Sequence, residues 1–352
     1  MAPPRAIASL ACLAGVLVMT ACTSSAPPPP PPAPPPLPGL LLSVSSDQTA
    51  SSLIRYRPAD ASTETIESPI DPEAVNRGTI ASVTTAEGSL FVAANSRALQ
   101  AFAIPAGASE VEELGPPLNV RADDEPVLEV SEAGVVVTTC DDARVLPLPE
   151  ADRWIDIPPT CWAALDPAGP RVAFATAGGH VLLNRLDGER EPSLLFDLDD
   201  LRALLGTDAT PRLVGAPSWG PQGLAFFVRA GDQLAVFLRD ETGRLVEVLQ
   251  EEYANVYRVP RLAWQPGGTV LAISDDAGPN TAVLRVFDTK AGELRALSMF
   301  PVGYAGIQWA PDGTSLAVLT GTGVVLVVDL NGDWLLRRET AWKQLLGWDA
   351  GP

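Results

Sequence analysis

Residues 309–313 read Trp-Ala-Pro-Asp-Gly, and the apolar run Leu-Ala-Val-Leu follows at residues 316–319. A turn rich in Pro, Asp and Gly between two apolar segments is typical of a β-hairpin. The pattern recurs as Trp-Gln-Pro-Gly-Gly at residues 264–268 and as Trp-Gly-Pro-Gln-Gly at residues 219–223, so successive copies lie 45 residues apart. A fixed period of this length indicates a repeat architecture.

Weaker copies of the turn precede these three, at residues 84–88, 130–134 and 165–169, and each is followed by an apolar segment. A third apolar segment, a polar turn and a fourth segment complete each unit, as in residues 285–297. Four antiparallel strands in one such unit form a blade of a β-propeller, which must pack against other blades in a ring. The sequence therefore predicts an all-β fold, a single β-propeller over residues 39–352.

The aromatic residue and the Pro-Asp-Gly turn that leads into a second apolar strand resemble the repeats of TolB-type, WD-repeat-like propellers. The resemblance covers residues 39–352, with three strong copies and three weak ones. It implies a propeller fold and does not imply a particular activity.

The two ends of this region predict the number of blades. Residues 346–352 repeat the first strand and its turn, whereas residues 38–44 read as a second strand without a first. We expect the last strand to pair with the N-terminal strand, because this pairing closes the ring and leaves no open sheet edge. The count is then seven blades; six is the alternative, since the copies at residues 84 and 130 are weak.

The N-terminal segment predicts export. Residues 1–21 carry Arg5 and a short apolar run, as a signal peptide does. Small residues directly before Cys22 resemble a bacterial lipobox, which implies a lipidated, palmitate-bearing Cys22; an ordinary signal peptide cleaved near Ala21 is the alternative. Residues 22–38 are rich in Pro and predict an extended tether. The expected location is the extracytoplasmic side of a cell membrane or outer membrane, reached through the lipid anchor.

The charge balance argues against nucleic acid as a partner. The chain has 24 Lys and Arg against 43 Asp and Glu, a net charge of −19, and phosphate backbones are bound by basic surfaces. A monomeric propeller without a metal or other cofactor is expected.

Two cysteines belong to the predicted propeller, Cys140 and Cys161. Cys140 follows a second strand, and Cys161 precedes the first strand of the next blade. Both connections lie on the same face of a propeller, so we predict a disulfide, which an oxidising compartment would allow. Two unpaired buried thiols are the alternative.

The later connections between blades are rich in aromatic residues. Exposed aromatics beside an Arg are typical of protein interfaces, and the candidate partner-binding face comprises Tyr253, Tyr257, Arg258, Phe300, Tyr304 and Trp342. Alternatively, these aromatics pack over the joints between blades. Residues 196–206 predict a short helix on the same rim, with Asp197 before its start and Gly206 at its end. This helix either leans on the propeller or docks a partner.

Few residues indicate catalysis. His180 is the single histidine, so neither a His pair nor a His-based triad is evident, and no nucleophile-elbow or phosphate-loop motif occurs. The acidic turn at residues 274–280 could hold calcium, but its spacing matches no EF-hand loop. The main prediction is a non-catalytic scaffold that binds an envelope or secreted protein. The alternative is a propeller enzyme, or a carbohydrate- or metal-binding protein, that acts on envelope material through carboxylates in the central funnel.

Overall fold

The structure is a computed structural model. It describes residues 39–45, 51–70, 80–85, 87–94, 98–119, 126–148, 152–187, 191–252, 261–278, 281–301, 304–320, 322–340 and 344–349. The predicted signal peptide, Cys22 and the tether up to residue 38 lie outside this set, so the prediction of lipidation stays a prediction.

The described residues form seven four-stranded antiparallel sheets, which we number as blades 1 to 7. Strands are given from the inner to the outer edge of each blade. Blade 1 contains β28 (Gln344–Asp349), β1 (Gly39–Ser45), β2 (Ser51–Arg57) and β3 (Ser62–Ile66). Blade 2 contains β4 (Ile80–Thr85), β5 (Gly88–Ala94), β6 (Ala98–Pro105) and β7 (Glu112–Asn119). Blade 3 contains β8 (Val127–Ser131), β9 (Gly134–Thr138), β10 (Ala143–Pro147) and β11 (Ile155–Ile157).

The remaining four blades follow the same order along the chain. Blade 4 contains β12 (Ala163–Asp166), β13 (Arg171–Ala175), β14 (His180–Arg185) and β15 (Ser193–Asp197). Blade 5 contains β16 (Arg212–Gly220), β17 (Gly223–Ala230), β18 (Gln233–Asp240) and β19 (Leu245–Glu252). Blade 6 contains β20 (Arg261–Trp264), β21 (Val270–Gly278), β22 (Thr281–Asp288) and β23 (Glu293–Pro301). Blade 7 contains β24 (Tyr304–Trp309), β25 (Ser315–Thr320), β26 (Val324–Asp329) and β27 (Trp334–Glu339).

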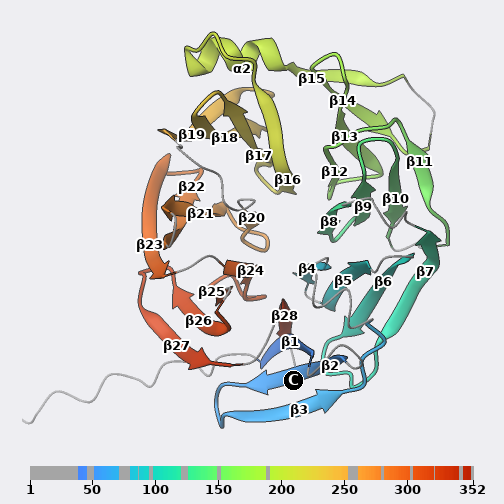
Figure 1. Cartoon of the computed structure of the whole chain (residues 1–352), viewed down its shortest axis with the longest axis vertical. Coiled ribbons are helices and arrows are strands. Elements are labelled where there is room, and N and C mark those ends of the chain that lie inside the picture. The colour runs from blue at the N-terminus through green and yellow to red at the C-terminus, as the bar shows by residue number, and fades with distance from the viewer. Residues whose placement is uncertain are drawn as a thin grey trace, which may run out of the picture. The chain divides into compact units, whose positions relative to one another are not determined.

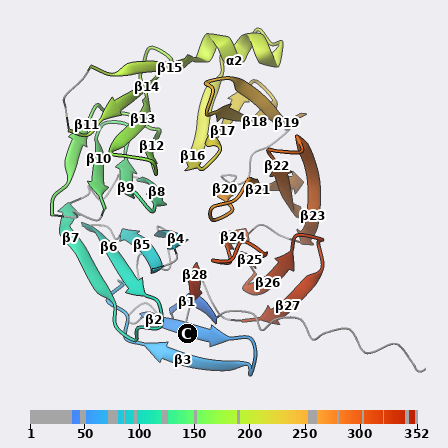
Figure 2. The ribbon, with the colours of Figure 1, turned by 180° about the vertical axis from the view of Figure 1, so that it is seen from behind.

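The blades are arranged in a ring with one strand of each nearest the axis (Figure 1), and the view from behind shows the same order (Figure 2). The prediction of seven blades is therefore confirmed, and the alternative of six is wrong. All seven inner strands follow a connection from the preceding blade, so they begin on the same face of the ring.

The predicted closure of the ring is also confirmed. β1 lies between β28 and β2, where Leu40 is opposite Trp348 on one side and opposite Tyr56 on the other. A buried ion pair joins the same strands, since Arg55 Nε lies 2.5 Å from Asp349 Oδ2 and both side chains are less than 10% exposed.

The Trp residues of the repeat connect successive blades. The indole N–H of Trp264 donates to the carbonyl of Ser218 at 3.0 Å, and that of Trp309 donates to the carbonyl of Ala263 at 2.9 Å. The indole N–H of Trp348 makes the same hydrogen bond, to the carbonyl of Gln308 at 3.1 Å. Each acceptor carbonyl belongs to the residue directly before the Trp of the preceding repeat, as Ser218 stands directly before Trp219. The Trp therefore recurs because one indole fills the joint between blades and satisfies a carbonyl there.

Helix α2 (Leu198–Leu205) leads from blade 4 toward blade 5. Asp197 is its N-cap, and Gly206 ends it with a left-handed φ of 61°, as the sequence predicts. Leu201 and Leu205 are buried in a cluster with Phe196 and Phe226. Of the two predicted roles, the structure shows the first, because the helix packs against the propeller. None of the helices in the described ranges has the length and apolarity to cross a bilayer.

Candidate functional site

Glu129 is a buried carboxyl on an inner strand of the ring. It lies in the middle of β8, the inner strand of blade 3, opposite Val136 of β9. Val136 packs with Leu165 and Val172 of blade 4, so this face of the sheet is turned toward the neighbouring blade. Glu129 is 9% exposed. β8 therefore places the Glu129 carboxyl in the joint between blades 3 and 4, on the side of that joint nearest the inner strands.

Burial changes the protonation of Glu129. Loss of hydration raises the pKa of the carboxyl to about 8, although the backbone N–H of Leu165 donates a hydrogen bond to it and lowers the pKa in part. At neutral pH the carboxyl is therefore mainly neutral and carries a proton. Its Oε2 atom has no hydrogen-bond partner, so the structure leaves a potential proton donor unused at the inner strand.

Two hydroxyl groups share this face of blade 3. Ser131 lies two residues from Glu129 along β8, and Thr138 of β9 is opposite Val127. Both side chains are buried, and neither oxygen has a hydrogen-bond partner. Buried hydroxyl groups without partners are uncommon in folded proteins. This face of blade 3 therefore carries three buried polar groups, Glu129, Ser131 and Thr138, that each have an oxygen without a hydrogen-bond partner.

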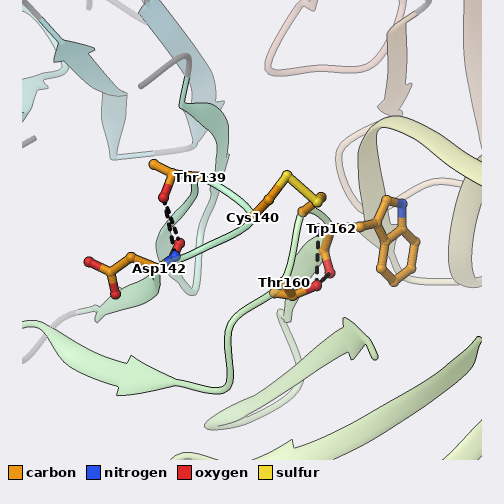
Figure 3. The surroundings of a disulfide bond; sticks show 6 residues. Thr139, Cys140, Asp142, Thr160 and Trp162 are labelled. Atoms are coloured by element: carbon orange, nitrogen blue, oxygen red, sulfur yellow. Dashed lines mark hydrogen bonds between the residues drawn. A yellow bond between two sulfur atoms is a disulfide. The ribbon is translucent and has the colours of Figure 1, made fainter. Parts of the chain in front are cut away.

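The predicted disulfide is present and crosses the same joint. Cys140 follows β9 and Cys161 precedes β12, so the bond links blades 3 and 4. Figure 3 shows how hydrogen bonds shape the two loops: Thr139 and Asp142 bond on one side, and Thr160 and Trp162 on the other. Cys140 has a positive φ of 68°, uncommon for a residue other than Gly. The disulfide therefore stabilises the two blades between which Glu129 lies.

The inner strand of blade 5 contains a bulge and approaches the inner strand of blade 3, which carries Glu129. β16 pairs Val214 with Phe227 and Ser218 with Ala225, so residues 215–217 are opposite a single residue of β17. β16 and β8 belong to blades 5 and 3, yet Cα atoms of the two strands approach within 8 Å. Such bulges often lie beside functional sites and redirect the strand. The candidate site is accordingly the region around β8, β12 and β16.

His180 forms a pair that the sequence did not predict. Its Nδ1 atom contacts a carboxylate oxygen of Asp197, and its ring is about half exposed. The two residues are opposite each other in the ladder between β14 and β15. Only the strand register could reveal this pairing, because the residues are 17 positions apart. Both strands lie in the outer half of blade 4, away from Glu129.

The predicted partner-binding face is only partly described. Tyr253, Tyr257, Arg258 and Trp342 lie outside the described residues, and Tyr304 begins β24 with a side chain that is not described. Phe300 does not fit the prediction. It is 1% exposed and packs with Leu284 and Ile307, because β23 continues to Pro301 and carries Phe300 into the core between blades 6 and 7. The alternative of packing over a joint is correct for this residue.

Other candidate sites are weaker. A shallow hollow of about 520 Å³ follows the outer strand β19 and is lined by Gln233, Glu247 and Glu251, among others. Glu251 is already paired with Arg285 at 2.6 Å. No group of three or more His, Cys, Asp or Glu with metal-binding geometry occurs among the described residues. The side chains of Asp275 and Asp276 in the predicted acidic turn are not described.

Comparison with known proteins identifies the fold. No protein-family model matches the chain, and no curated protein matches it. A solved structure of a candidate 6-phosphogluconolactonase from Bacteroides uniformis superposes with a TM-score of 0.54 at 14% identity, covering 88% of this chain and 97% of that one. The periplasmic gluconolactonase of Pseudomonas aeruginosa gives 0.54 at 13% identity, with the same coverage of 88% and 97%. TolB from Acinetobacter baumannii gives 0.49 at 12% identity, covering 89% of this chain and 66% of that one.

These comparisons correct the functional prediction. At such low identity they establish the seven-bladed propeller fold. The compared structures with TM-scores above 0.5 are named as lactonases, which are hydrolytic enzymes. The prediction of a non-catalytic scaffold, and with it the prediction that the protein is not an enzyme, is therefore contradicted. The alternative of a propeller enzyme is the better supported of the two.

Proposed function

We propose that this protein is a propeller hydrolase that opens a sugar-derived lactone at its inner strands. The observation that carries the proposal is the neutral carboxyl of Glu129, whose Oε2 atom has no partner on the inner strand β8. The lactonase names of the structural neighbours support the choice of substrate class. A carboxyl kept neutral by burial can act as a general acid at neutral pH.

Lactone hydrolysis needs one proton donor and one acceptor, and Glu129 can serve as both. Water adds to the carbonyl carbon, and the bond between that carbon and the ring oxygen then breaks. Glu129 gives its proton to the departing ring oxygen, which becomes a hydroxyl group, and recovers a proton from the added water. The product is an open-chain hydroxy acid. Because Oε2 is shielded in this structure, the side chain must turn about its torsions to meet the substrate.

The proposal predicts the effect of replacing Glu129. Glu129→Gln keeps the shape but removes the transferable proton, so kcat/KM for glucono-δ-lactone should fall by roughly 10²- to 10⁴-fold. The wild-type kcat/KM should be level below pH 8 and decline above it, because the protonated form is active and the pKa is about 8. Spontaneous hydrolysis is subtracted at each pH.

Glu132→Gln is the matched control, because Glu132 lies in the turn after β8 and is exposed. It should leave kcat/KM unchanged. A folded Glu129→Gln protein with wild-type kcat/KM would exclude this role for Glu129. A wild-type protein inactive on a panel of sugar lactones would exclude the proposed substrate class.

We further propose that the protein is exported and anchored through a lipid on Cys22, which would place the propeller beside envelope material. The support is the sequence alone, in residues 1–22. Growth with labelled palmitate should label the wild-type protein and not Cys22→Ser, and the variant should move to the soluble fraction. An equally labelled, membrane-bound variant would contradict the proposal.

A further inference from the structure

Two arginines lie opposite each other where β16 begins. Arg212 pairs with Arg229 of β17 in the ladder of blade 5. Directly opposed residues of an antiparallel ladder carry their side chains on the same face, and like charges placed so are unfavourable. Both side chains are exposed. Neither guanidinium forms an ion pair with a carboxylate in the described part of the chain.

Arg229 is held in a defined direction. Its Nε atom donates to the carbonyl of Gly231 at 3.2 Å, which leaves the two terminal nitrogens available. Arg261 begins β20, the inner strand of the next blade, and is likewise exposed and without an ion pair among the residues described. Because all inner strands begin on one face and Arg229 is opposite Arg212, the three arginines lie on the face where β16 and β20 begin.

We propose that Arg212 and Arg229 bind an oxyanion group of the substrate, a carboxylate or a phosphate. Guanidinium groups bind such groups with two parallel hydrogen bonds, and a pair of them is more selective than one. The net charge of −19 would otherwise repel an anionic molecule. An anion bound here would also relieve the repulsion between the two arginines.

This inference rests on the proposed function, which places the lactone ring of the substrate beside Glu129. The strand that carries Arg212 approaches β8, which carries Glu129, within 8 Å. In the proposal, one small molecule spans these two inner strands, with its anionic end at the start of β16 and its lactone ring toward β8. The substrate class becomes an acidic sugar lactone, in preference to a neutral one.

Binding of inorganic phosphate and of gluconate to the full mature protein, measured by isothermal titration calorimetry, tests the inference, with glucose as the neutral probe. The double variant Arg212→Gln/Arg229→Gln should bind both anions at least tenfold more weakly. Arg295→Gln is the matched control, because Arg295 is exposed on the outer strand β23 and its loss changes the net charge in the same direction. It should bind the anions as the wild type does.

The outcomes separate this inference from the proposed function. Undetectable binding of both anions to the wild type, or equal binding by the double variant, overturns the inference. Anion binding that depends on the two arginines supports it even where Glu129→Gln has no effect on hydrolysis. A further outcome is that the double variant hydrolyses phosphorylated and neutral lactones as the wild type does, while hydrolysis still depends on Glu129. That result would support the proposed enzyme activity and overturn the proposed anion site.

Discussion

Glu129 and Gln308 occupy equivalent positions, one residue before the first position of their repeats. In blade 7 the carbonyl of Gln308 accepts the indole N–H of Trp348. In blade 3 the next repeat begins with Leu165, which has no indole, and the Glu129 carboxyl instead accepts the backbone N–H of Leu165. At this joint, where the repeat begins with Leu165 and not with Trp, a buried carboxyl therefore contacts the next blade. At the scale of the residue, this carboxyl defines the candidate site.

The Trp positions were predictable because their spacing is visible in the chain, whereas the role of Glu129 was not. Burial of Glu129 depends on Val136, which the ladder of blade 3 places opposite it, and on Leu165, which is adjacent only after blades 3 and 4 have packed. The pairing of His180 with Asp197 likewise requires the register of two strands. Composition shows many carboxylates and does not indicate which one loses its hydration.

The raised pKa of Glu129 predicts a pH-dependent stability. An exposed Glu titrates near the reference value of 4.5, and the folded protein holds its proton up to about pH 8. Between these values the folded state binds the extra proton, so the free energy of unfolding should fall as pH rises, by up to about 1.4 kcal/mol per pH unit. This contribution is complete below pH 4.5 and lost above pH 8.

Urea denaturation at pH 5, 6, 7 and 8 measures this slope. Glu129→Gln cannot ionise, so its stability relative to the wild type should increase steadily across the series. Glu132→Gln, at an exposed position, should follow the wild type. Parallel curves for wild type and Glu129→Gln would show that Glu129 is ionised at neutral pH.

At the scale of the element, the positions of the second strands and of the helix ends agree with those predicted from the local sequence. The second strand of each predicted unit matches a strand of the structure, and helix α2 begins and ends where Asp197 and Gly206 predict. The prediction for Phe300 was wrong because the fourth strand of blade 6 runs to Pro301, whereas the sequence placed its end at Leu297. Strand length is fixed by pairing with β22, which extends to Thr281, and not by the sequence of β23 alone.

Helix α2 offers a test of which of its faces stabilises the protein. Leu201 is fully buried against blade 5, so Leu201→Ala should lower the free energy of unfolding by about 2–5 kcal/mol through the cavity it leaves. Leu204 lies on the same helix and is 48% exposed, so Leu204→Ala should cost less than about 0.5 kcal/mol. Thermal denaturation of both variants gives the comparison. Equal losses would mean that the helix does not pack as described.

At the scale of the whole molecule, the ring is closed by pairing of the two ends of the propeller region. The sequence predicted this because each end holds part of one repeat. The ion pair that accompanies the closure was not predictable, because Arg55 and Asp349 lie 294 positions apart and no periodicity relates them. The number of blades follows from the repeats, whereas the chemistry of each joint depends on its own side chains.

The closing ion pair predicts a large effect of one carboxylate and a small effect of another. Asp349→Ala leaves the buried Arg55 without its close partner and should cost about 3 kcal/mol of stability. Glu64 also contacts Arg55, at 3.1 Å, but its side chain is 39% exposed, so Glu64→Ala should cost less than about 1 kcal/mol. Chemical denaturation of the two variants provides the measurement. A smaller loss for Asp349→Ala than for Glu64→Ala would contradict the assignment.

The position of β1 has a mechanical consequence. β1 is not an outer strand, because hydrogen bonds hold it to β28 on one side and to β2 on the other. Consider a force applied at residue 38 along the direction of β1. It would act in shear on the hydrogen bonds to β28 and to β2 at the same time, so these bonds could not break one after another. Removal of this strand would also break the ring. Any tension that reaches the propeller through the residues before Gly39 therefore acts on a strand that is clamped on both sides.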